Sequence, residues 1–315
     1  MHKTSIKTST YVYFVDSAKR LLATALVCLF SASACADFTF AAFGDTPYTD
    51  EEESRFPGMI AEINREKLAF VIHVGDFKSG WSPCTDALFL QRREQFALFH
   101  HALIYTPGDN EWTDCWQAPF AADATRDPLE RLQKLRYLFF ADNHTLGQNK
   151  LALTRQSASY PEHARWEHEG IVFATLNVPG GGNNKRMPEE FVARNQATQA
   201  WVSAIFGHAR AEGRRAVVLA MQANPFGGDG RAGASYAGLM HTLTRETLNF
   251  KGEVLLIHGD THRFRMDQPL YDAPSKRFVR NFTRLEVFGY PFMNWVRVRV
   301  GNQNGTVNFA ASPGG

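Results

Sequence analysis

Residues 70–76 have the sequence Phe70-Val71-Ile72-His73-Val74-Gly75-Asp76, an apolar run that stops at a glycine followed by an aspartate. A run this rich in β-branched residues predicts a buried strand. The aspartate would then lie at the carboxyl end of the strand, where open α/β sheets bind their ligands. Gly-Asp after a strand is also ordinary turn chemistry, so this pair alone predicts no function.

Three further apolar runs end in the same way. They cover residues 38–43, 103–105 and 254–257, and each is followed by a glycine and then an aspartate, namely Asp45, Asp109 and Asp260. We expect these carboxylates and Asp76 to meet at one edge of one sheet. Four unpaired carboxylates in one place repel strongly, and a bound cation is the simplest way to neutralise them.

The composition describes a globular α/β protein. The chain has 315 residues, 44% of them apolar and 13% aromatic, which is ample material for a core. Its formal net charge of +2 argues against an extended nucleic-acid-binding surface.

Strands alternate with helices, and extra hairpin strands follow in the middle and at the end. This order predicts two packed mixed β-sheets flanked by helices, in one domain spanning 37–315.

Local signals give the boundaries of several elements. Helices are expected after Thr49-Asp50 and Asp127-Pro128, where capping residues precede apolar stripes, and from about Pro188. A strand is expected over 68–75, a helix over 86–101 and a hairpin that turns at 169–170. Residues 141–164 look irregular, and the glycine-rich run 179–184 is expected to be a flexible loop.

The first 36 residues resemble a secretory signal peptide. Basic residues precede a short apolar segment, 21–30, and Ala34-Cys35-Ala36 fits a small-x-small cleavage site. We therefore expect a periplasmic or secreted protein with no transmembrane span in its mature chain. The alternatives are a disordered tail or a membrane anchor; lipidation of Cys35 is less favoured, because no large aliphatic residue stands three positions upstream. Removing four basic residues and one acidic residue changes the net charge from +2 to −1.

Only two cysteines, Cys84 and Cys115, lie beyond this leader. An even pair in an exported protein favours a disulfide over two free thiols. Each follows a Gly-Asp strand end by a few residues, so the bridge would join two loops at the same sheet edge. Zinc binding is less favoured, because no C-x-x-C spacing occurs.

Taken in order, the strand-end motifs resemble those of the calcineurin-like metallophosphoesterase superfamily, whose pattern is D-x-H, G-D, G-N-H-D/E, a lone His and G-H-x-H. Gly44-Asp45-Thr46-Pro47 keeps the first aspartate but has proline for the histidine, and Gly75-Asp76 matches the second motif. In Gly108-Asp109-Asn110-Glu111, Asp109 stands at the metal-binding asparagine and Asn110 at the catalytic histidine. Gln222 falls where the lone His would be, and Gly259-Asp260-Thr261-His262 keeps only the last histidine.

This resemblance implies two divalent metal ions. Asp45, Asp76 and His262 would hold one ion, with the Tyr48 phenol beside them, and Asp76, Asp109, Gln222 and Asp260 would hold the other. Oxygen-rich ligands favour Mn, Fe, Mg or Ca over Zn at the second site. In the family, a metal-bound hydroxide attacks the phosphorus atom of a phosphate ester.

The leaving group needs a proton donor other than the family's histidine. Asn110 cannot supply a proton as an imidazolium does, so Glu111, His73 or water would have to, or the substrate would need a good leaving group. His73 lies within an apolar strand, which favours a core histidine with satisfied hydrogen bonds over a catalytic one.

Two functions of different classes are favoured, and a non-phosphate hydrolase on the same fold is a weaker third. The first is an exported dimetal phosphoesterase that hydrolyses a phosphate mono- or diester of a small phosphorylated substrate. The alternative is a metal-binding or non-catalytic binding module on the same fold, whose altered ligands no longer support hydrolysis.

Overall fold

The computed structural model describes residues 1–2, 37–118, 125–226 and 233–315. The described residues from 37 onward belong to one compact unit. Residues 3–36, which make up nearly all of the expected signal peptide and include Cys35, lie outside the described residues.

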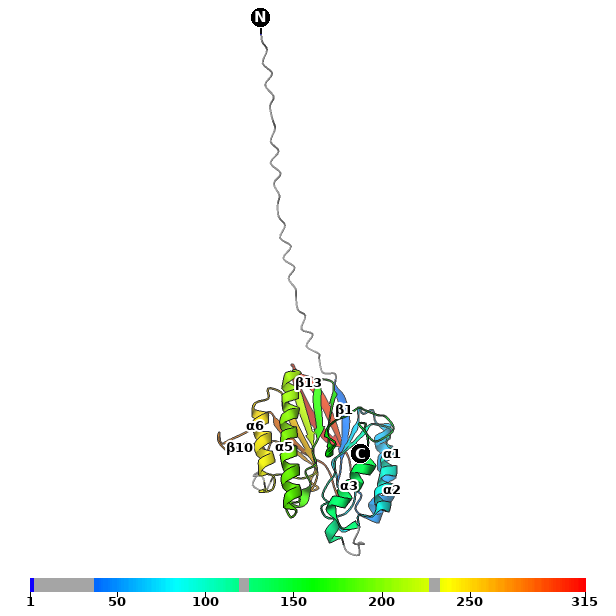
Figure 1. The fold of residues 1–315 in the computed structure, drawn as a ribbon. Coiled ribbons are helices and arrows are strands. Elements are labelled where there is room, and N and C mark those ends of the chain that lie inside the picture. The colour runs from blue at the N-terminus through cyan, green and yellow to red at the C-terminus, as the bar shows by residue number, and fades with distance from the viewer. Residues whose placement is uncertain (3–36, 119–124, 227–232) are drawn as a thin grey trace. The chain divides into compact units, whose positions relative to one another are not determined.

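Two β-sheets form the centre of this unit (Figure 1). The first has the strand order β14-β13-β1-β2-β3. In it β1, β2 and β3 are parallel to one another, β13 is antiparallel to β1, and β14 is antiparallel to β13. Its strands are β1 (Phe38–Phe43), β2 (Val71–His73), β3 (Leu103–Tyr105), β13 (Val296–Gln303) and β14 (Thr306–Pro313).

The second sheet has seven strands in the order β4-β5-β6-β7-β8-β12-β9, and β6, β7, β8 and β12 are parallel. Its strands are β4 (Thr154–Ser157), β5 (Tyr160–His168), β6 (Ile171–Thr175), β7 (Ala216–Ala220), β8 (Glu253–His258), β9 (Arg265–Asp267) and β12 (Phe282–Glu286). A separate small hairpin is formed by β10 (Tyr271–Asp272) and β11 (Arg277–Phe278).

Helices cover the outer faces of both sheets. On the first sheet they are α1 (Asp50–Arg65), α2 (Asp86–Phe96) and α3 (Pro128–Phe139); on the second they are α5 (Pro188–Ala211) and α6 (Ala237–Leu248) (Figure 1). A 3₁₀ turn, η1 (Cys115–Gln117), and a short helix, α4 (Gly180–Asn183), lie in the connections. Thr49 and Asp127 cap α1 and α3 as expected.

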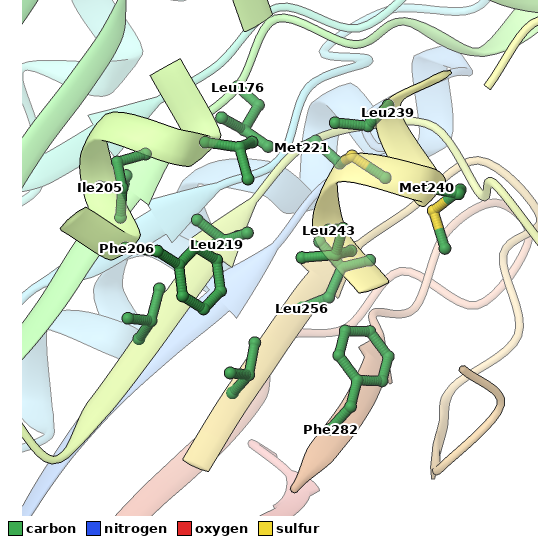
Figure 2. Close-up of a cluster of buried hydrophobic side chains, with 14 of the residues drawn as sticks. Leu176, Ile205, Phe206, Leu219, Met221, Leu239, Met240, Leu243, Leu256 and Phe282 are labelled. Atoms are coloured by element: carbon green, nitrogen blue, oxygen red, sulfur yellow. The ribbon is translucent and has the colours of Figure 1, made fainter. Parts of the chain in front are cut away.

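Three buried apolar clusters establish the layers. Along β1, Phe40 and Ala42 join the cluster between the two sheets, whereas Ala41 and Phe43 join the cluster beneath α1, α2 and α3. The third cluster lies between the second sheet and the helices α5 and α6 (Figure 2). Because side chains alternate across a strand, one strand serves two cores. The predicted fold class of two packed mixed sheets flanked by helices is therefore confirmed.

Several predicted boundaries differ from the structure. The strand expected over 68–75 is paired only at Val71–His73, and the helix expected over 86–101 ends at Phe96. Residues 141–164 are not wholly irregular, since β4 and the first part of β5 lie there. The hairpin turn at 169–170 is confirmed, with both residues at positive φ.

The predicted disulfide between Cys84 and Cys115 is present, with a Cα–Cα distance of 5.7 Å. Both cysteines are fully buried in the cluster beneath α1, α2 and α3. In the described part of the chain, no helix combines the length and the apolar character that a membrane crossing requires.

Candidate metal centre

The four Gly-Asp motifs follow β1, β2, β3 and β8. The expectation that one sheet carries all four is wrong, because β8 belongs to the seven-stranded sheet. The carboxyl ends of the two sheets nevertheless lie together, so Asp260 contacts the group formed by the other three: its backbone N–H donates to Asp45 Oδ1 at 3.0 Å. The site therefore lies across the ends of both sheets rather than along one edge.

Sharp backbone turns aim the site residues. Asp45, Asp76, Asp260 and His262 have φ angles of 53°, 59°, 78° and 58°, a region that non-glycine residues seldom adopt. Such conformations cost on the order of 1 kcal/mol each and persist where the surroundings enforce them, often at functional sites. Here the turn directly after the strand directs each side chain toward the shared centre.

The glycine of one motif makes room for the aspartate of another. A Cβ atom on Gly108 would lie 2.0 Å from Asp76 Oδ1, and one on Gly259 would lie 1.9 Å from Asp45 Oδ2. Neither contact is possible for any other residue type, so the motifs need glycine for close packing between strands.

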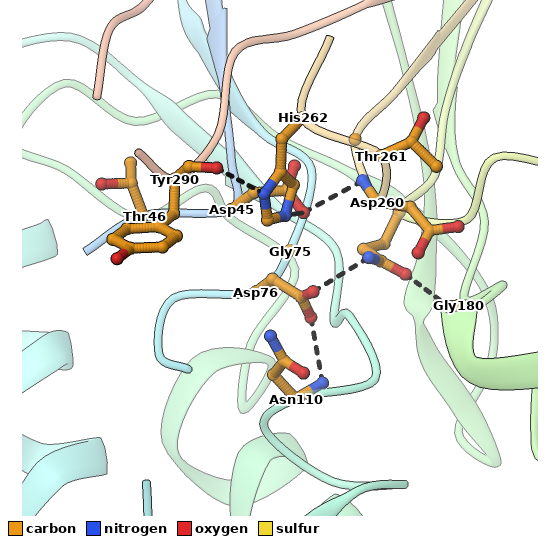
Figure 3. A network of polar contacts seen from close by, with 12 residues as sticks. Asp45, Thr46, Gly75, Asp76, Asn110, Gly180, Asp260, Thr261, His262 and Tyr290 are labelled. Atoms are coloured by element: carbon orange, nitrogen blue, oxygen red, sulfur yellow. Dashed lines mark hydrogen bonds and ion pairs between the residues drawn. The ribbon is translucent and has the colours of Figure 1, made fainter. Parts of the chain in front are cut away.

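Asp76 is the hub of the hydrogen-bond network (Figure 3). Its Oδ2 accepts from the Tyr48 hydroxyl at 3.1 Å and from Gln222 Nε2 at 3.0 Å, and its Oδ1 accepts from the Asn110 backbone N–H at 3.0 Å. Burial, together with the charge of Asp109, raises the pKa of Asp76 well above its usual value.

Asp45 and His262 form the opposite side of the centre. His262 Nε2 lies 3.5 Å from Asp45 Oδ1, while its Nδ1 donates to the Tyr290 carbonyl oxygen at 2.7 Å (Figure 3). That second bond fixes the ring and leaves Nε2 directed into the site. Burial lowers the pKa of His262, but the neighbouring Asp45 carboxylate outweighs it, so the pKa is raised overall.

The glycine-rich run that the sequence suggested as a flexible loop is a wall of the centre. A Cβ on Gly180 would lie within 3.0 Å of three oxygen atoms at once: Asp260 Oδ1, Asp109 Oδ1 and Gln222 Oε1. The Gly180 N–H also donates to Gln222 Oε1. Arg194 holds both ends of the run by donating to the Asn177 carbonyl at 3.1 Å and to Asn183 Oδ1 at 2.7 Å.

Two carboxylate oxygens of the centre are buried without a hydrogen-bond partner: Asp45 Oδ2 and Asp109 Oδ1. Burial raises the pKa of Asp109 well above its usual value, and it raises the pKa of Asp260 to about 6. Buried, unpartnered carboxylate oxygens are stable only when they take up a proton or bind a cation. A divalent cation bound here would satisfy both oxygens.

In the ranges 37–118, 125–226 and 233–315, no group of three or more His, Cys, Asp or Glu side chains stands ready to hold a metal ion. Two of the expected ligands, Tyr48 and Gln222, are of other types, and both donate hydrogen bonds to Asp76. Metal binding would require these two bonds to be released, so that the phenol and the amide present oxygen instead.

The three expected catalytic residues occupy different surroundings. Asn110 lines the cavity, and its Nδ2 donates to the Tyr48 hydroxyl at 2.9 Å. Glu111 is fully buried and accepts from the backbone N–H groups of Asp76 and Gly108 and from the Tyr105 hydroxyl. It therefore holds two of the Gly-Asp turns in place.

His73 is also fully buried, and it lies outside the cavity lining. Its Nδ1 accepts from the Gly75 N–H at 2.9 Å, and its ring packs edge-on against Phe43 and Tyr105. Burial lowers the pKa of His73 well below its usual value. These contacts are those of a core histidine that shapes the turn before Asp76.

A cavity of about 520 Å³ opens above the centre. It is lined by residues of the motifs and by Asp114, Trp81 and Tyr290, which the sequence did not single out. No sequence pattern marks these three: Trp81 and Asp114 each follow a motif by five residues, and Tyr290 lies in the connection after β12. The disulfide joins two of the segments that form the walls, those containing Trp81 and Asp114.

No family model and no curated protein matches this chain. Solved structures to which it is similar include PhoD, with 12% identity over 89% of this chain and 69% of that one, at a TM-score of 0.46. A dimetal phosphatase from Danio rerio is 10% identical over 86% and 98% of the two chains, at a TM-score of 0.44. The purple acid phosphatase PPD1 from yellow lupin (Lupinus luteus) seeds is 10% identical over 90% of this chain and 52% of that one, at a TM-score of 0.49.

Proposed function

We propose that this chain is an exported, metal-dependent phosphoesterase that hydrolyses a phosphate mono- or diester. The observation that supports the proposal is the convergence of carboxylates from four strand ends, two of them with buried oxygens that have no partner. Maintaining such a group is costly unless a cation neutralises it, and a cation above an open cavity is typical of hydrolytic sites.

Asp45, Asp76, His262 and Tyr48 would hold one divalent ion, and Asp76, Asp109, Gln222 and Asp260 a second, with Mn, Fe, Mg or Ca favoured by the oxygen donors. When bound, such ions polarise phosphoryl oxygens and lower the pKa of water into the neutral range.

The remaining polar groups of the centre bind and orient the substrate. The Asn110 amide lines the cavity and offers an uncharged hydrogen bond to a phosphoryl oxygen. Glu111, through the backbone of Asp76 and Gly108, is a positioning residue. Because Glu111 and His73 are buried away from the cavity, the leaving group takes its proton from solvent, which favours substrates with acidic leaving groups.

Asp76→Asn tests the proposal. We expect it to reduce Mn²⁺ binding, measured by isothermal titration calorimetry, and to lower kcat/KM on p-nitrophenyl esters by on the order of a hundredfold. The matched control is Asp50→Asn, which changes an exposed aspartate on α1 and should change neither quantity.

Undiminished hydrolysis in Asp76→Asn would refute the assignment of the centre. Stoichiometric Mn²⁺ binding without hydrolysis of any phosphate ester would instead favour the non-catalytic binding module.

Export is tested separately, by N-terminal sequencing of the protein recovered from the periplasm or medium, where Asp37 is the expected first residue.

A further inference from the structure

We propose that the substrate is a phosphodiester bearing a planar ring group, and that Trp81 and Tyr290 contact this ring. The proposal rests on the proposed function, because it concerns the same cavity. It draws on two independent features: the distribution of charge around the centre and the exposed aromatic side chains on its rim.

The described residues that line the cavity include no lysine and no arginine. Its charged side chains are Asp76, Asp109, Asp114 and Asp260, and His262 is the only basic group among them. Two divalent ions would do no more than balance the carboxylates of the centre, so little positive charge would remain for the substrate.

Two cationic side chains of the described residues, Lys78 and Arg186, interact electrostatically with carboxylates that line the cavity, but each also donates to a backbone carbonyl. Lys78 is 2% exposed, and its Nζ donates to the Ser79 carbonyl oxygen at 2.8 Å. The Arg186 guanidinium donates to the Thr113 carbonyl oxygen and lies 4.7 Å above the Trp116 ring. Neither lines the cavity, so neither is placed to clamp a phosphate group.

This charge balance distinguishes the two ester classes. A phosphate monoester is largely a dianion at neutral pH, because its second pKa is about 6, and sites for it commonly supply arginine. A diester carries one negative charge. A cavity with uncharged donors such as Asn110 and a surplus of carboxylates therefore suits the monoanion better than the dianion.

The rim of the cavity is aromatic. Trp81 is 73% exposed and Tyr290 is 43% exposed, although both line the cavity. An exposed aromatic side chain beside a polar cavity offers a flat apolar surface to a ligand, and aromatic rings stack well on planar groups.

Both side chains are anchored through their backbone. The Trp81 N–H donates to Ser79 Oγ at 3.2 Å, and the Tyr290 N–H donates to the Asp45 carbonyl oxygen at 3.0 Å. Tyr290 also stacks on Tyr48, with ring centroids 5.9 Å apart and an interplanar angle of 21°. Aromatic surface is therefore continuous from the centre, where Tyr48 contacts Asp76, to the rim.

Catalytic preference is tested with two esters that share one leaving group. We expect kcat/KM for bis(p-nitrophenyl) phosphate to exceed that for p-nitrophenyl phosphate by tenfold or more in the Mn²⁺-loaded protein. A preference for the monoester would overturn the proposal.

A binding measurement tests the same proposal without turnover. By calorimetry on the Mn²⁺-loaded protein, diphenyl phosphate should bind more tightly than phenyl phosphate. Trp81→Ala should lower the affinity for diphenyl phosphate about tenfold while leaving the affinity for dimethyl phosphate unchanged. Trp81→Phe should restore most of the lost affinity. The control is Tyr137→Ala, an equally exposed aromatic on α3 that lies outside the cavity lining.

The outcomes separate this proposal from the proposed function. Absence of turnover together with tighter binding of diphenyl phosphate would refute the enzyme and support the ligand class. Turnover with tighter binding of phenyl phosphate, or an unchanged affinity in Trp81→Ala, would support the enzyme and overturn the ligand class.

Discussion

Gln222 connects two walls of the centre through one amide group. Its Nε2 donates to Asp76, and its Oε1 accepts from Gly180. The resemblance to the metallophosphoesterase motifs pointed to this position, at the place of the lone histidine, but it did not reveal that the amide spans two elements. The same holds for Glu111, whose buried carboxylate supports the turns instead of facing the cavity.

Gln222→Glu should make folding more dependent on metal. Without metal, the new carboxylate replaces a donor to Asp76 by a repelling charge, and Tm should fall by roughly 5 °C. With Mn²⁺, the glutamate carboxylate is a stronger ligand than the amide oxygen it replaces. The rise in Tm on adding metal should therefore exceed that of the wild type.

Differential scanning fluorimetry with and without MnCl₂ measures both effects. Gln222→Met is the control, because it removes the donor without adding a ligand; its Tm should fall, and metal should not restore it. An equal rise in Tm for wild type and Gln222→Glu would contradict a role of this position in metal binding.

His163 should contribute to the acid limb of stability, together with His73 and His258, whose pKa values burial also lowers. It is fully buried, and burial lowers its pKa to about 4, whereas an unfolded histidine has a pKa of about 6.5. Between these values the unfolded chain takes up a proton that the folded protein excludes. Stability is therefore unaffected above pH 6.5 and falls as the pH drops toward 4.

In His163→Asn, which keeps a donor for Gln156 Oε1, this contribution is absent. The loss of unfolding free energy between pH 7 and pH 4, measured by urea denaturation, should shrink by on the order of 3 kcal/mol. Identical pH dependence in both proteins would show that folding does not lower the pKa of His163.

At the scale of elements, the segments with strong local signals were predictable. Thr49 and the Asp127-Pro128 pair fix the starts of α1 and α3 because capping is a local interaction. β4 was not predictable, since its four residues are Thr-Arg-Gln-Ser and only pairing with β5 makes them a strand. The run 179–184 was missed for a similar reason: glycines that suggest flexibility are held against the centre by Arg194.

Gly180→Ala should weaken metal binding without unfolding the protein. Its added methyl group would lie 2.6 Å from Asp260 Oδ1 and 2.8 Å from Asp109 Oδ1, so the run has to move away from the carboxylates. We expect the Mn²⁺ affinity measured by calorimetry to fall about tenfold.

Gly207→Ala, within α5, is the matched control. A methyl group there meets nothing within 4 Å, and it should stabilise the helix by roughly 0.5–1 kcal/mol while leaving the metal affinity unchanged. Wild-type affinity in Gly180→Ala would mean that the wall does not constrain the ligands.

For the whole molecule, the alternation of strands and helices, with extra hairpin strands in the middle and at the end, predicted two packed sheets flanked by helices. The pattern could not assign strands to sheets: β8 was expected beside β1, β2 and β3, but it pairs with β7 and β12. Sheet membership depends on connections across the whole chain, and no local signal encodes it.

The disulfide links two segments that lie 31 residues apart in the sequence. The double variant Cys84→Ser/Cys115→Ser should lower the unfolding free energy by about 3 kcal/mol, because the unfolded chain regains the entropy of an open loop. Urea denaturation measures this loss, and wild-type protein under reducing conditions should match the variant. Unchanged stability in both would show that packing alone holds these segments.

The packing of Gly108 against Asp76 and of Gly259 against Asp45 has a consequence for how this sequence changes over generations. Replacing the glycine of one turn displaces an aspartate that follows a different strand. The effect of the mutation therefore depends on a residue that is distant in the sequence. We therefore expect epistasis between the glycine and the aspartate of each pair, because their close packing couples the effects of mutating them. Anyone transplanting the centre into another scaffold would have to move both partners of each pair together.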